Sequence, residues 1–523
     1  MIAEIIIFIV TTVFFYILYV HKKIHYFFKE RDVKFLPGVP MFGNMYQSTV
    51  GKKHYLEDLA AVYTAFPDEK YVGLIEGGSP IIIIRDPELI KTITVKDFDH
   101  FVNHKQFFDP DVDPLFGGSI IMMKDDKWRD MRVTLSPAFT GSKMRLMMNF
   151  MTEVSHNIID YLKEHISEEI HVDDLVRRYT LDVIGSAGFG IQVNSVRDKD
   201  NEFFKIGMNL FTFDFHQKLA LFMSAQFPKL GKKLGITVFP PRVMNFFKNT
   251  ITETISYRKN NNVVRPDMIQ LLMEASKGTL TDSNPEKEDV GFATTEEALK
   301  QKGVTREWTE DEIIGQVFIF FAAGFESSAA AITLCIHELA LNEEVQEKLY
   351  KEIQQHQASN TLSYENVNQL KYLDCVVNET LRKWTAAIFM DRMCNKPYEL
   401  PPPREGGKPY RLNPGDVVYN MVNVIHMDDK YHPNAQQFNP DRFSDENKHK
   451  IVPFTFMPFG MGPRNCIASR FALLEVKVFL YDLVLNFKIA KSQKTADPIR
   501  LHNLDFNIKA TGGSYVKFEL RST

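Results

Sequence analysis

A single cysteine on a glycine-punctuated loop is the residue whose surroundings most clearly indicate chemistry. Cys466 lies within Phe459-Gly-Met-Gly-Pro-Arg-Asn-Cys-Ile-Ala468, directly before an apolar helical pattern that runs from Ser469 to about Phe487. The two glycines permit backbone angles that other residues avoid, so we expect a tight loop whose free amides donate hydrogen bonds toward the sulfur. The positive end of the following helix dipole also favours an ionised sulfur. The pattern therefore predicts a thiolate in an apolar setting, which is a metal ligand.

The other cysteines narrow the kind of metal site. Cys335, Cys375 and Cys394 are scattered, and none of the four cysteines forms a CxxC spacing. A zinc site and an iron–sulfur cluster are poor explanations, because both need several clustered ligands. A lone axial ligand indicates heme. The alternative is an ordinary buried core cysteine after a loop, and the flanking Phe459, glycines and Arg464 argue against it.

A second set of residues combines an acid with a hydroxyl. The stretch Ala322-Ala-Gly-Phe-Glu-Ser-Ser328 places Glu326 and Ser327 inside an otherwise apolar helical pattern. Such a pair can relay protons to a bound oxygen species. Taken alone, the stretch is more simply explained as a polar patch on a core helix.

Arginines with aromatic or acidic neighbours form a third set. Glu379 and Arg382 are spaced i, i+3, which allows an ion pair on one helix face. Trp128 and Arg132 are spaced i, i+4, and a further arginine, Arg442, lies in the proline-fixed loop Phe438-Asn-Pro-Asp-Arg-Phe443. Individually these are ordinary pairs, and their combination in one fixed order is far more specific.

The elements that must position these residues are mostly helical. A capping box at Thr309-Glu-Asp-Glu312 begins a helix that runs to about Ala340, and two strands joined by a turn are predicted at 71–75 and 81–84. The segment between Glu274 and Arg306 has no periodicity and is interpreted as a mobile surface loop. Other helical patterns lie around Lys143–Ile166, Val172–Gly188 and Arg242–Tyr257.

The N-terminal end predicts a membrane anchor. Residues 2–20 are almost wholly apolar and long enough to cross a bilayer, and Lys22 and Lys23 follow the apolar run rather than precede it, which favours a retained anchor over a cleaved signal peptide. The positive-inside rule then places the rest of the chain in the cytosol. In the remaining composition, 24% charged residues and a net charge of −4 give no indication of a nucleic-acid-binding surface.

The ordered set of motifs resembles cytochrome P450, a heme-thiolate monooxygenase. FxxGxRxC before a helix, ExxR upstream, an FxPxRF loop between them, the acid–hydroxyl helix and WxxxR cover essentially the whole chain. Two runs, 128–144 and 316–328, resemble insect microsomal members allied to the vertebrate drug-metabolising clan. The resemblance implies a mainly α protein with the cytochrome P450 fold, a small β-rich subdomain and an N-terminal transmembrane helix. The expected divisions are residues 1–21 as anchor, 22–44 as a basic and proline/glycine-containing linker and 45–523 as catalytic domain.

The same resemblance assigns roles to individual residues. Cys466 would be the iron ligand of heme b, and Glu326 and Ser327 would be catalytic groups that deliver protons. Other residues bound to the cofactor would be Trp128, Arg132, Arg392, Arg464, His104 and Phe459. A structural ion network would comprise Glu379, Arg382 and Arg442. The substrate pocket would include Phe107, Phe108, Ile319, Ala322, Ala323, Ala387 and Ile388, which are apolar and imply a lipophilic substrate.

The resemblance also implies partners and a location. O2 would be a co-substrate, with electrons derived from NADPH through NADPH-cytochrome P450 reductase and with cytochrome b5 as a further candidate donor. The expected site is the endoplasmic reticulum membrane, with the catalytic domain on the cytosolic face. Xenobiotics such as plant toxins or insecticides are the first substrate hypothesis. The alternatives are an endogenous steroid or juvenoid hormone, a reductase-independent heme-thiolate isomerase, and a non-catalytic toxin-binding heme protein.

Three positions depart from the family pattern. Ser327 stands where threonine is usual, which keeps the hydroxyl but loses the methyl group that restricts its rotamers. Ala468 stands where glycine is usual, and little consequence is expected. Thr385 replaces a proline that would fix the chain direction beside the heme edge. We therefore expect the substrate pocket to differ in shape from that of most family members.

Overall fold

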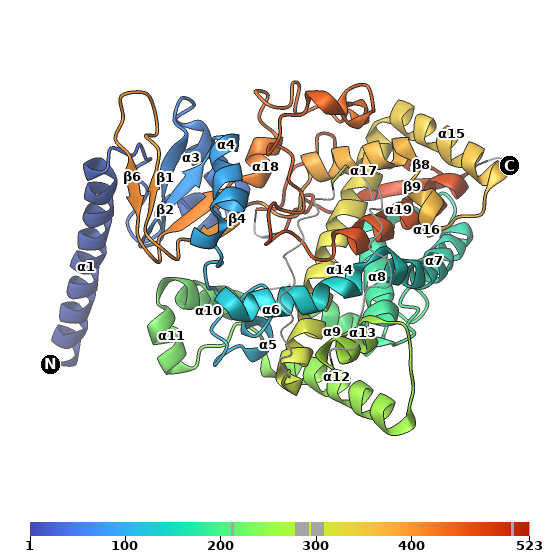
Figure 1. Cartoon of the computed structure of the whole chain (residues 1–523), viewed down its shortest axis with the longest axis horizontal. Coiled ribbons are helices and arrows are strands. Elements are labelled where there is room, and N and C mark those ends of the chain that lie inside the picture. Colours follow the sequence, from blue (N-terminus) through green and yellow to red (C-terminus); the bar gives the residue numbers. More distant parts are fainter. Residues whose placement is uncertain (211–213, 278–291, 294–307, 504–506, 522–523) are drawn as a thin grey trace.

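The long helix predicted from the capping box organises the fold. In a computed structural model of the chain, which describes residues 1–210, 214–277, 292–293, 308–503 and 507–521 (Figure 1), helix α14 spans Glu310–Leu341. Thr309 accepts a hydrogen bond from the amide of Glu312, whose side chain in turn accepts from the amide of Thr309, so the predicted capping box is confirmed. Most of α14 is buried, which makes it the central rod of the helical body.

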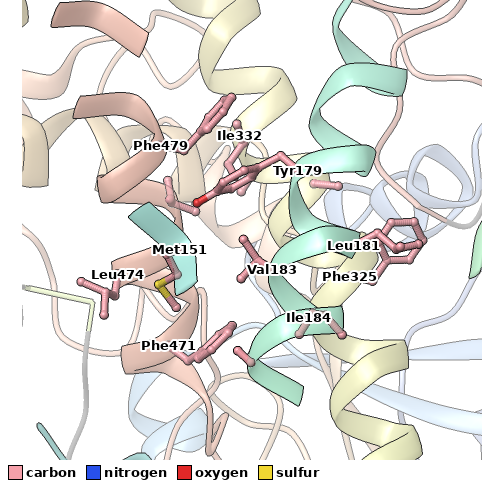
Figure 2. Close-up of a cluster of buried hydrophobic side chains, with 14 of the residues drawn as sticks. Met151, Tyr179, Leu181, Val183, Ile184, Phe325, Ile332, Phe471, Leu474 and Phe479 are labelled. Atoms are coloured by element: carbon pink, nitrogen blue, oxygen red, sulfur yellow. The ribbon is translucent and has the colours of Figure 1, made fainter. Parts of the chain in front are cut away.

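Helices α7 (Gly141–Glu164), α8 (Val172–Ile184) and α19 (Ser469–Asn486) pack around this rod. Figure 2 shows their shared core, in which Tyr179 and Val183 of α8 meet Phe471 and Phe479 of α19. The Tyr179 and Phe479 rings lie 4.2 Å apart, centroid to centroid. Because α19 begins three residues after Cys466, this core fixes the position of the cysteine loop relative to α14.

The small sheets form a second, smaller unit. The main sheet has the strand order β1-β2-β7-β4, with β1 (Tyr71–Glu76) antiparallel to β2 (Ser79–Ile84), β2 parallel to β7 (Val417–Asn420) and β7 antiparallel to β4 (Met390–Met393). The hairpin predicted between β1 and β2 is confirmed, with Gly77 at φ 59° in its turn. Two smaller sheets are β3-β9-β8 and β5-β6, formed by Glu169–His171, Tyr515–Leu520, Phe487–Lys491, Tyr398–Leu400 and Tyr410–Leu412.

The N-terminal helix is longer than the predicted anchor. Helix α1 spans Ile2–Glu30, so the first residues of the expected linker continue the helix (Figure 1). Its apolar N-terminal part is exposed, whereas Ile24 and Phe28 are buried against the β-rich unit, and a side chain at Gly73 would collide with the Phe28 ring. Of the described helices, α1 and α14 are long and apolar enough to cross a membrane, and α14 is mostly buried.

The remaining described helices complete the body. The patterns predicted around 143–166, 172–188 and 242–257 correspond to α7, α8 and α12. The aperiodic segment between Glu274 and Arg306 lies largely outside the described residues; its first residues end α13. The other helices are α2 (Tyr46–Thr49), α3 (Tyr55–Thr64), α4 (Pro87–Lys91), α5 (Pro114–Gly117), α6 (Asp125–Leu135), α9 (Glu202–Leu210), α10 (Phe215–Gln226), α11 (Pro228–Leu234), α12 (Pro241–Asn261), α13 (Met268–Ser276), α15 (Glu343–Ser359), α16 (Tyr364–Val367), α17 (Lys371–Lys383) and α18 (Val422–His426).

Candidate active site

An internal cavity of about 600 Å³ collects most of the residues singled out in the sequence. Its wall is largely apolar and is built from α14, α6, β4, the end of α8 and the loop before α19. The predicted site residues that line it are Cys466, Phe459, Arg464, Trp128, Arg132, His104, Arg392, Ser327, Ile319, Ala323 and Ala387. Residues far apart in the chain, such as Trp128 and Cys466, therefore share one chamber, although no short-range sequence signal joins them.

The loop before α19 holds Cys466 at the cavity wall. Gly460 and Gly462 have φ angles of 76° and 72°, and a side chain at Gly462 would collide with the carbonyl of Thr94. The amide of Cys466 donates to the carbonyl of Phe459 over 2.8 Å, so this amide closes the loop and is not free to face the sulfur. Burial raises the pKa of the Cys466 thiol, while the amide of Ala468 and the charge of Arg132 act in the opposite direction.

Three guanidinium groups, one buried (Arg392) and two half-buried (Arg132 and Arg464), form a positively charged part of the wall. Arg132 donates to the carbonyl of Asn465 over 2.7 Å, and burial lowers its pKa to about 10. Arg392 is 1% exposed, its Nε has no partner among the described residues, and burial lowers its pKa to about 10. Arg464 lies over the Trp128 ring at 4.0 Å, and burial, reinforced by Arg392, lowers its pKa to about 8.

Few anions balance these cations. Asp391 is the one carboxylate among the described lining residues, and its Oδ1 lies 2.9 Å from Nδ1 of His104. Burial acts to raise the pKa of Asp391, yet His104, the amide of Lys105 and Arg392 together lower it. The sequence reasoning missed Asp391, whose position directly before Arg392 was the available signal. The cavity therefore carries more buried positive than negative charge, which calls for an anionic ligand.

Glu326, the acid of the predicted proton-relay pair, does not face the cavity. Ser327 lines the cavity and its hydroxyl donates to the carbonyl of Ala323 over 2.6 Å. Glu326 is absent from the cavity lining and accepts a hydrogen bond from Arg177 of α8 over 3.1 Å. Consecutive helix residues are about 100° apart, so neighbours in the chain reach different faces. Lys509, 4.0 Å away, is a second cation beside Glu326.

Several residues predicted for the substrate pocket lie elsewhere. Ala322 shares the face of α14 that carries Glu326, one turn earlier, and packs in the helical core. Ile388 packs in the core of the β-rich unit. The ring of Phe108 packs against that of Phe116, with the centroids 4.4 Å apart and the planes tilted by 44°, and Phe107 lies under the ammonium of Lys105. The cavity lining instead includes aromatic residues that the sequence did not single out, namely Phe139, Phe189, Phe320 and Phe321.

The expected ion network is present on α17. The carboxylate of Glu379 accepts two hydrogen bonds from Arg382, at 2.7 and 2.8 Å, and lies 3.3 Å from Nε of Arg442. Glu379 and Arg382 are fully buried. Arg382 also donates to the carbonyls of His426 and Ala435, each over 2.8 Å, so its donors are shared between the carboxylate and the backbone of the following segment.

Comparison with known proteins decides the family. The family model described as Cytochrome P450 matches residues 33–516. The chain belongs to the cytochrome P450 family. It is 40% identical over 510 residues to "Probable cytochrome P450 9f2" of Drosophila melanogaster, covering 95% of each chain, and 38% identical over 518 residues to "Cytochrome P450 9e2" of Blattella germanica, covering 95% of this chain and 94% of the relative. "Probable cytochrome P450 6a13" of Drosophila melanogaster is 34% identical over 509 residues, covering 96% of each chain.

These relatives confirm the predicted resemblance to insect P450 enzymes, the P450 fold and the assignment to the monooxygenase oxidoreductases. The family implies heme with a cysteine thiolate on its iron, and the cavity fits that group. A thiol lies in the wall, the wall is otherwise mostly apolar, and the excess of buried guanidinium charge matches the two propionates of heme b. The family match begins at residue 33, directly after α1 ends.

Proposed function

We propose that this P450 is a membrane-anchored monooxygenase that inserts one oxygen atom from O2 into lipophilic small molecules, in particular xenobiotics such as plant toxins or insecticides. The observation that carries the proposal is that one largely apolar cavity joins Cys466, Ser327 and the three arginines Arg132, Arg392 and Arg464. A thiol, a set of cations and a hydroxyl on an apolar wall are the protein groups that a heme-thiolate oxygenase requires.

The cofactor-binding roles follow from positions around the cavity. Cys466 would bind the iron, with Phe459 beside it in the loop, and Trp128, Arg132, Arg392, Arg464 and His104 would receive the propionates. When bound, heme supplies the oxygen-activating chemistry, which thiolate ligation promotes. The guanidinium donors of Arg132 and Arg464 are already held by backbone carbonyls, so they are oriented before a ligand arrives.

Proton supply would use both sides of α14. Ser327 would hold a proton donor at the cavity wall, where its hydroxyl is anchored to the carbonyl of Ala323. Glu326 would take protons from the side that faces Arg177 and Lys509 and pass them across the helix through water. On that side of the helix, Arg177 lies 3.1 Å and Lys509 lies 4.0 Å from the carboxylate.

Substrate selection would be made by an apolar and aromatic wall. Ile319, Ala323 and Ala387 line the cavity together with the four phenylalanines that the sequence did not single out. This lining supports a substrate without charge and with little polarity. An endogenous steroid or juvenoid hormone has the same properties and is the alternative substrate class.

The anchor and the partners complete the proposal. Residues 1–21 would span the endoplasmic reticulum membrane, and Lys22, Lys23, Lys29 and Arg31 would keep the catalytic domain, residues 45–523, on the cytosolic face. Residues 22–44 would connect the two, as a helix as far as Glu30 and as a proline- and glycine-containing segment beyond it. Electrons would come from NADPH-cytochrome P450 reductase, with cytochrome b5 as a further donor.

The carbon monoxide difference spectrum of the dithionite-reduced protein tests the proposal, with Cys466→Ser as comparison. The wild type should show the red-shifted Soret band of thiolate-ligated heme, and the variant should lack it. A heme-loaded wild type without that band rejects Cys466 as the ligand. Turnover with reductase and NADPH then separates the alternatives: NADPH-independent rearrangement of a peroxide indicates an isomerase, and spectral binding of substrates without oxidised product indicates a binding protein.

A further inference from the structure

The segment that leads into the cysteine loop has little regular structure to hold it. Residues Thr455–Phe459 lie outside every helix and strand. However, the carbonyl of Met457 accepts a hydrogen bond from the amide of Gly460 over 3.0 Å, and the carbonyl of Phe459 accepts one from the amide of Cys466 over 2.8 Å. The position of Met457 therefore sets the start of the turn in which Cys466 lies.

A buried histidine supplies the hydrogen bond that the segment lacks. His426, the last residue of α18, is fully buried, and its Nε2 accepts the amide of Met457 over 2.8 Å. Its Nδ1 lies 3.2 Å from the carbonyl of Arg382. An amide can only donate and a carbonyl can only accept, so the two contacts require one neutral tautomer with the proton on Nδ1.

A second hydrogen bond, in which Arg382 is the donor, also joins His426 to the ion network. The guanidinium of Arg382 donates to the carbonyl of His426 over 2.8 Å, while the imidazole of His426 faces the carbonyl of Arg382. The imidazole also stacks with Phe456, centroids 5.4 Å apart. A hydrogen-bonded path thus runs from Glu379 and Arg382 through the His426 ring to Met457, and from there to the Cys466 turn.

We propose that His426 is a positioning residue for the proximal ligand, whose imidazole fixes the cysteine loop to the Glu379–Arg382 network. His432 supports the same segment, because its Nε2 lies 3.0 Å from the carbonyl of Thr455. The imidazoles of His426 and His432 therefore hold this segment by hydrogen bonds, as backbone pairing would hold a β-strand. The inference rests on the proposed heme-thiolate function for its spectroscopic test, and on the hydrogen bonds alone for its second test.

Three substitutions at one position separate the two hydrogen bonds. His426→Phe keeps the ring and the stacking on Phe456 but removes both bonds. In His426→Gln the amide oxygen reaches the place of Nε2 and can accept from Met457, whereas in His426→Asn the amide nitrogen takes the place of Nδ1 and serves Arg382 alone. His337→Phe is the matched control: His337 is equally buried and has two hydrogen bonds of 2.8 Å, to Ser514 and to the carbonyl of Ala496, remote from the cysteine loop.

The first readout is the lifetime of the red-shifted band of the reduced carbon monoxide complex in mild urea. The Phe and Asn variants should lose the band about 10-fold faster than the wild type, which corresponds to the buried hydrogen bond to Met457 that both variants lack, and the Gln variant, which keeps that bond, should stay close to the wild type. The control variant should lower overall stability without this selective loss. Equal lifetimes in the Phe variant and the wild type, or an equal loss in the control, overturn the inference.

The second readout needs no turnover and no band. Hydrogen exchange at the amides of Met457 and Gly460 in the purified holoprotein should accelerate in the Phe and Asn variants and not in the Gln variant or the His337 control. Unchanged exchange at both amides in the Phe variant rejects the role of His426. A wild type that lacks the red-shifted band rejects the proposed function instead, and leaves this measurement to decide the inference on its own.

Discussion

Glu326 and Ser327 are neighbours in α14 that face different surroundings: Ser327 lines the cavity, and Glu326 is bound by Arg177 of α8 over 3.1 Å. Consecutive helix residues are about 100° apart, so a proton that passes between the two side chains must travel around the helix. The pair therefore connects two environments, one that contains the cations Arg177 and Lys509 and one that is the apolar cavity.

Removing the hydroxyl should uncouple oxygen use from product formation. Ser327→Ala should lower the product formed per NADPH severalfold and raise peroxide release, because the cavity wall loses its proton-holding group at Ala323. Product, NADPH and peroxide measured in one reaction check this. Ser327→Thr should retain wild-type coupling or improve it, since the added methyl restricts the rotamer. Wild-type coupling in the alanine variant would remove Ser327 from the mechanism.

Neutralising the acid should slow the reaction rather than redirect it. Glu326→Gln should reduce product formation by about 100-fold, the lower end of what a positioned acid or base contributes, and should enlarge the solvent isotope effect. Glu338→Gln is the control, because Glu338 is a buried acid of the same helix that pairs with Lys383 at 2.8 Å and is absent from the cavity lining. A normal rate in Glu326→Gln contradicts the proton route.

Glu475 should make stability fall as pH rises. Burial raises the pKa of this fully buried carboxyl of α19 to about 8, and the nearby Ser328 hydroxyl only partly opposes this. Between about pH 4.5 and 8 the folded protein holds a proton that the unfolded chain has lost, so the stabilising contribution is complete below about pH 4.5 and is lost as pH approaches 8.

Glu475→Gln mimics the protonated acid and should therefore remove this slope. At pH 7 it should raise the free energy of unfolding by about 3 kcal/mol, less than the full shift would give because the protein relaxes around a charge. Urea unfolding followed from pH 5 to 8 measures this, with the exposed Glu519 changed to Gln as control. Identical slopes in the wild type and Glu475→Gln would show that the carboxyl is ionised in the folded state.

Thr385, at the position where the family usually has proline, allows the energetic cost of an unpaired buried hydroxyl to be measured. Its side chain is fully buried and Oγ1 has no partner among the described residues. Thr385→Val keeps the shape and removes the unpaired group, and should stabilise the protein by about 1 kcal/mol. Thr380→Val should do the reverse, because that hydroxyl donates to the carbonyl of Val376 over 2.8 Å. Destabilisation at both positions would indicate that a bound water satisfies Thr385.

The sequence predicted well where local rules dominate. Thr309 begins α14 as predicted, because its capping box is complete within four residues. The spacing of Glu379 and Arg382 was enough to predict their ion pair. In each case the partners lie within one helical turn, so the tertiary structure had little to add.

Prediction failed for residues whose surroundings depend on the helix face they occupy or on a partner that is distant in the sequence. Ala322 and Ala323 are indistinguishable by residue type, yet one packs in the core and the other lines the cavity. Arg177 and Asp391, which bind Glu326 and His104, come from elements more than 140 residues away from their partners. Of the amides expected to serve the sulfur of Cys466, that of Ala468 does so, while the amide of Cys466 itself closes the loop on Phe459.

The unbroken course of α1 into the β-rich unit has a mechanical consequence. Phe28 is packed against Gly73 of β1, and no turn separates this buried end from the apolar segment that begins at Ile2. Any rotation of the β-rich unit relative to the apolar segment would have to bend the helix or unpack Phe28. If the proposed anchor spans a bilayer, the tilt of the apolar segment therefore sets the orientation of the catalytic domain, and a change in bilayer thickness would be transmitted through Phe28 to β1.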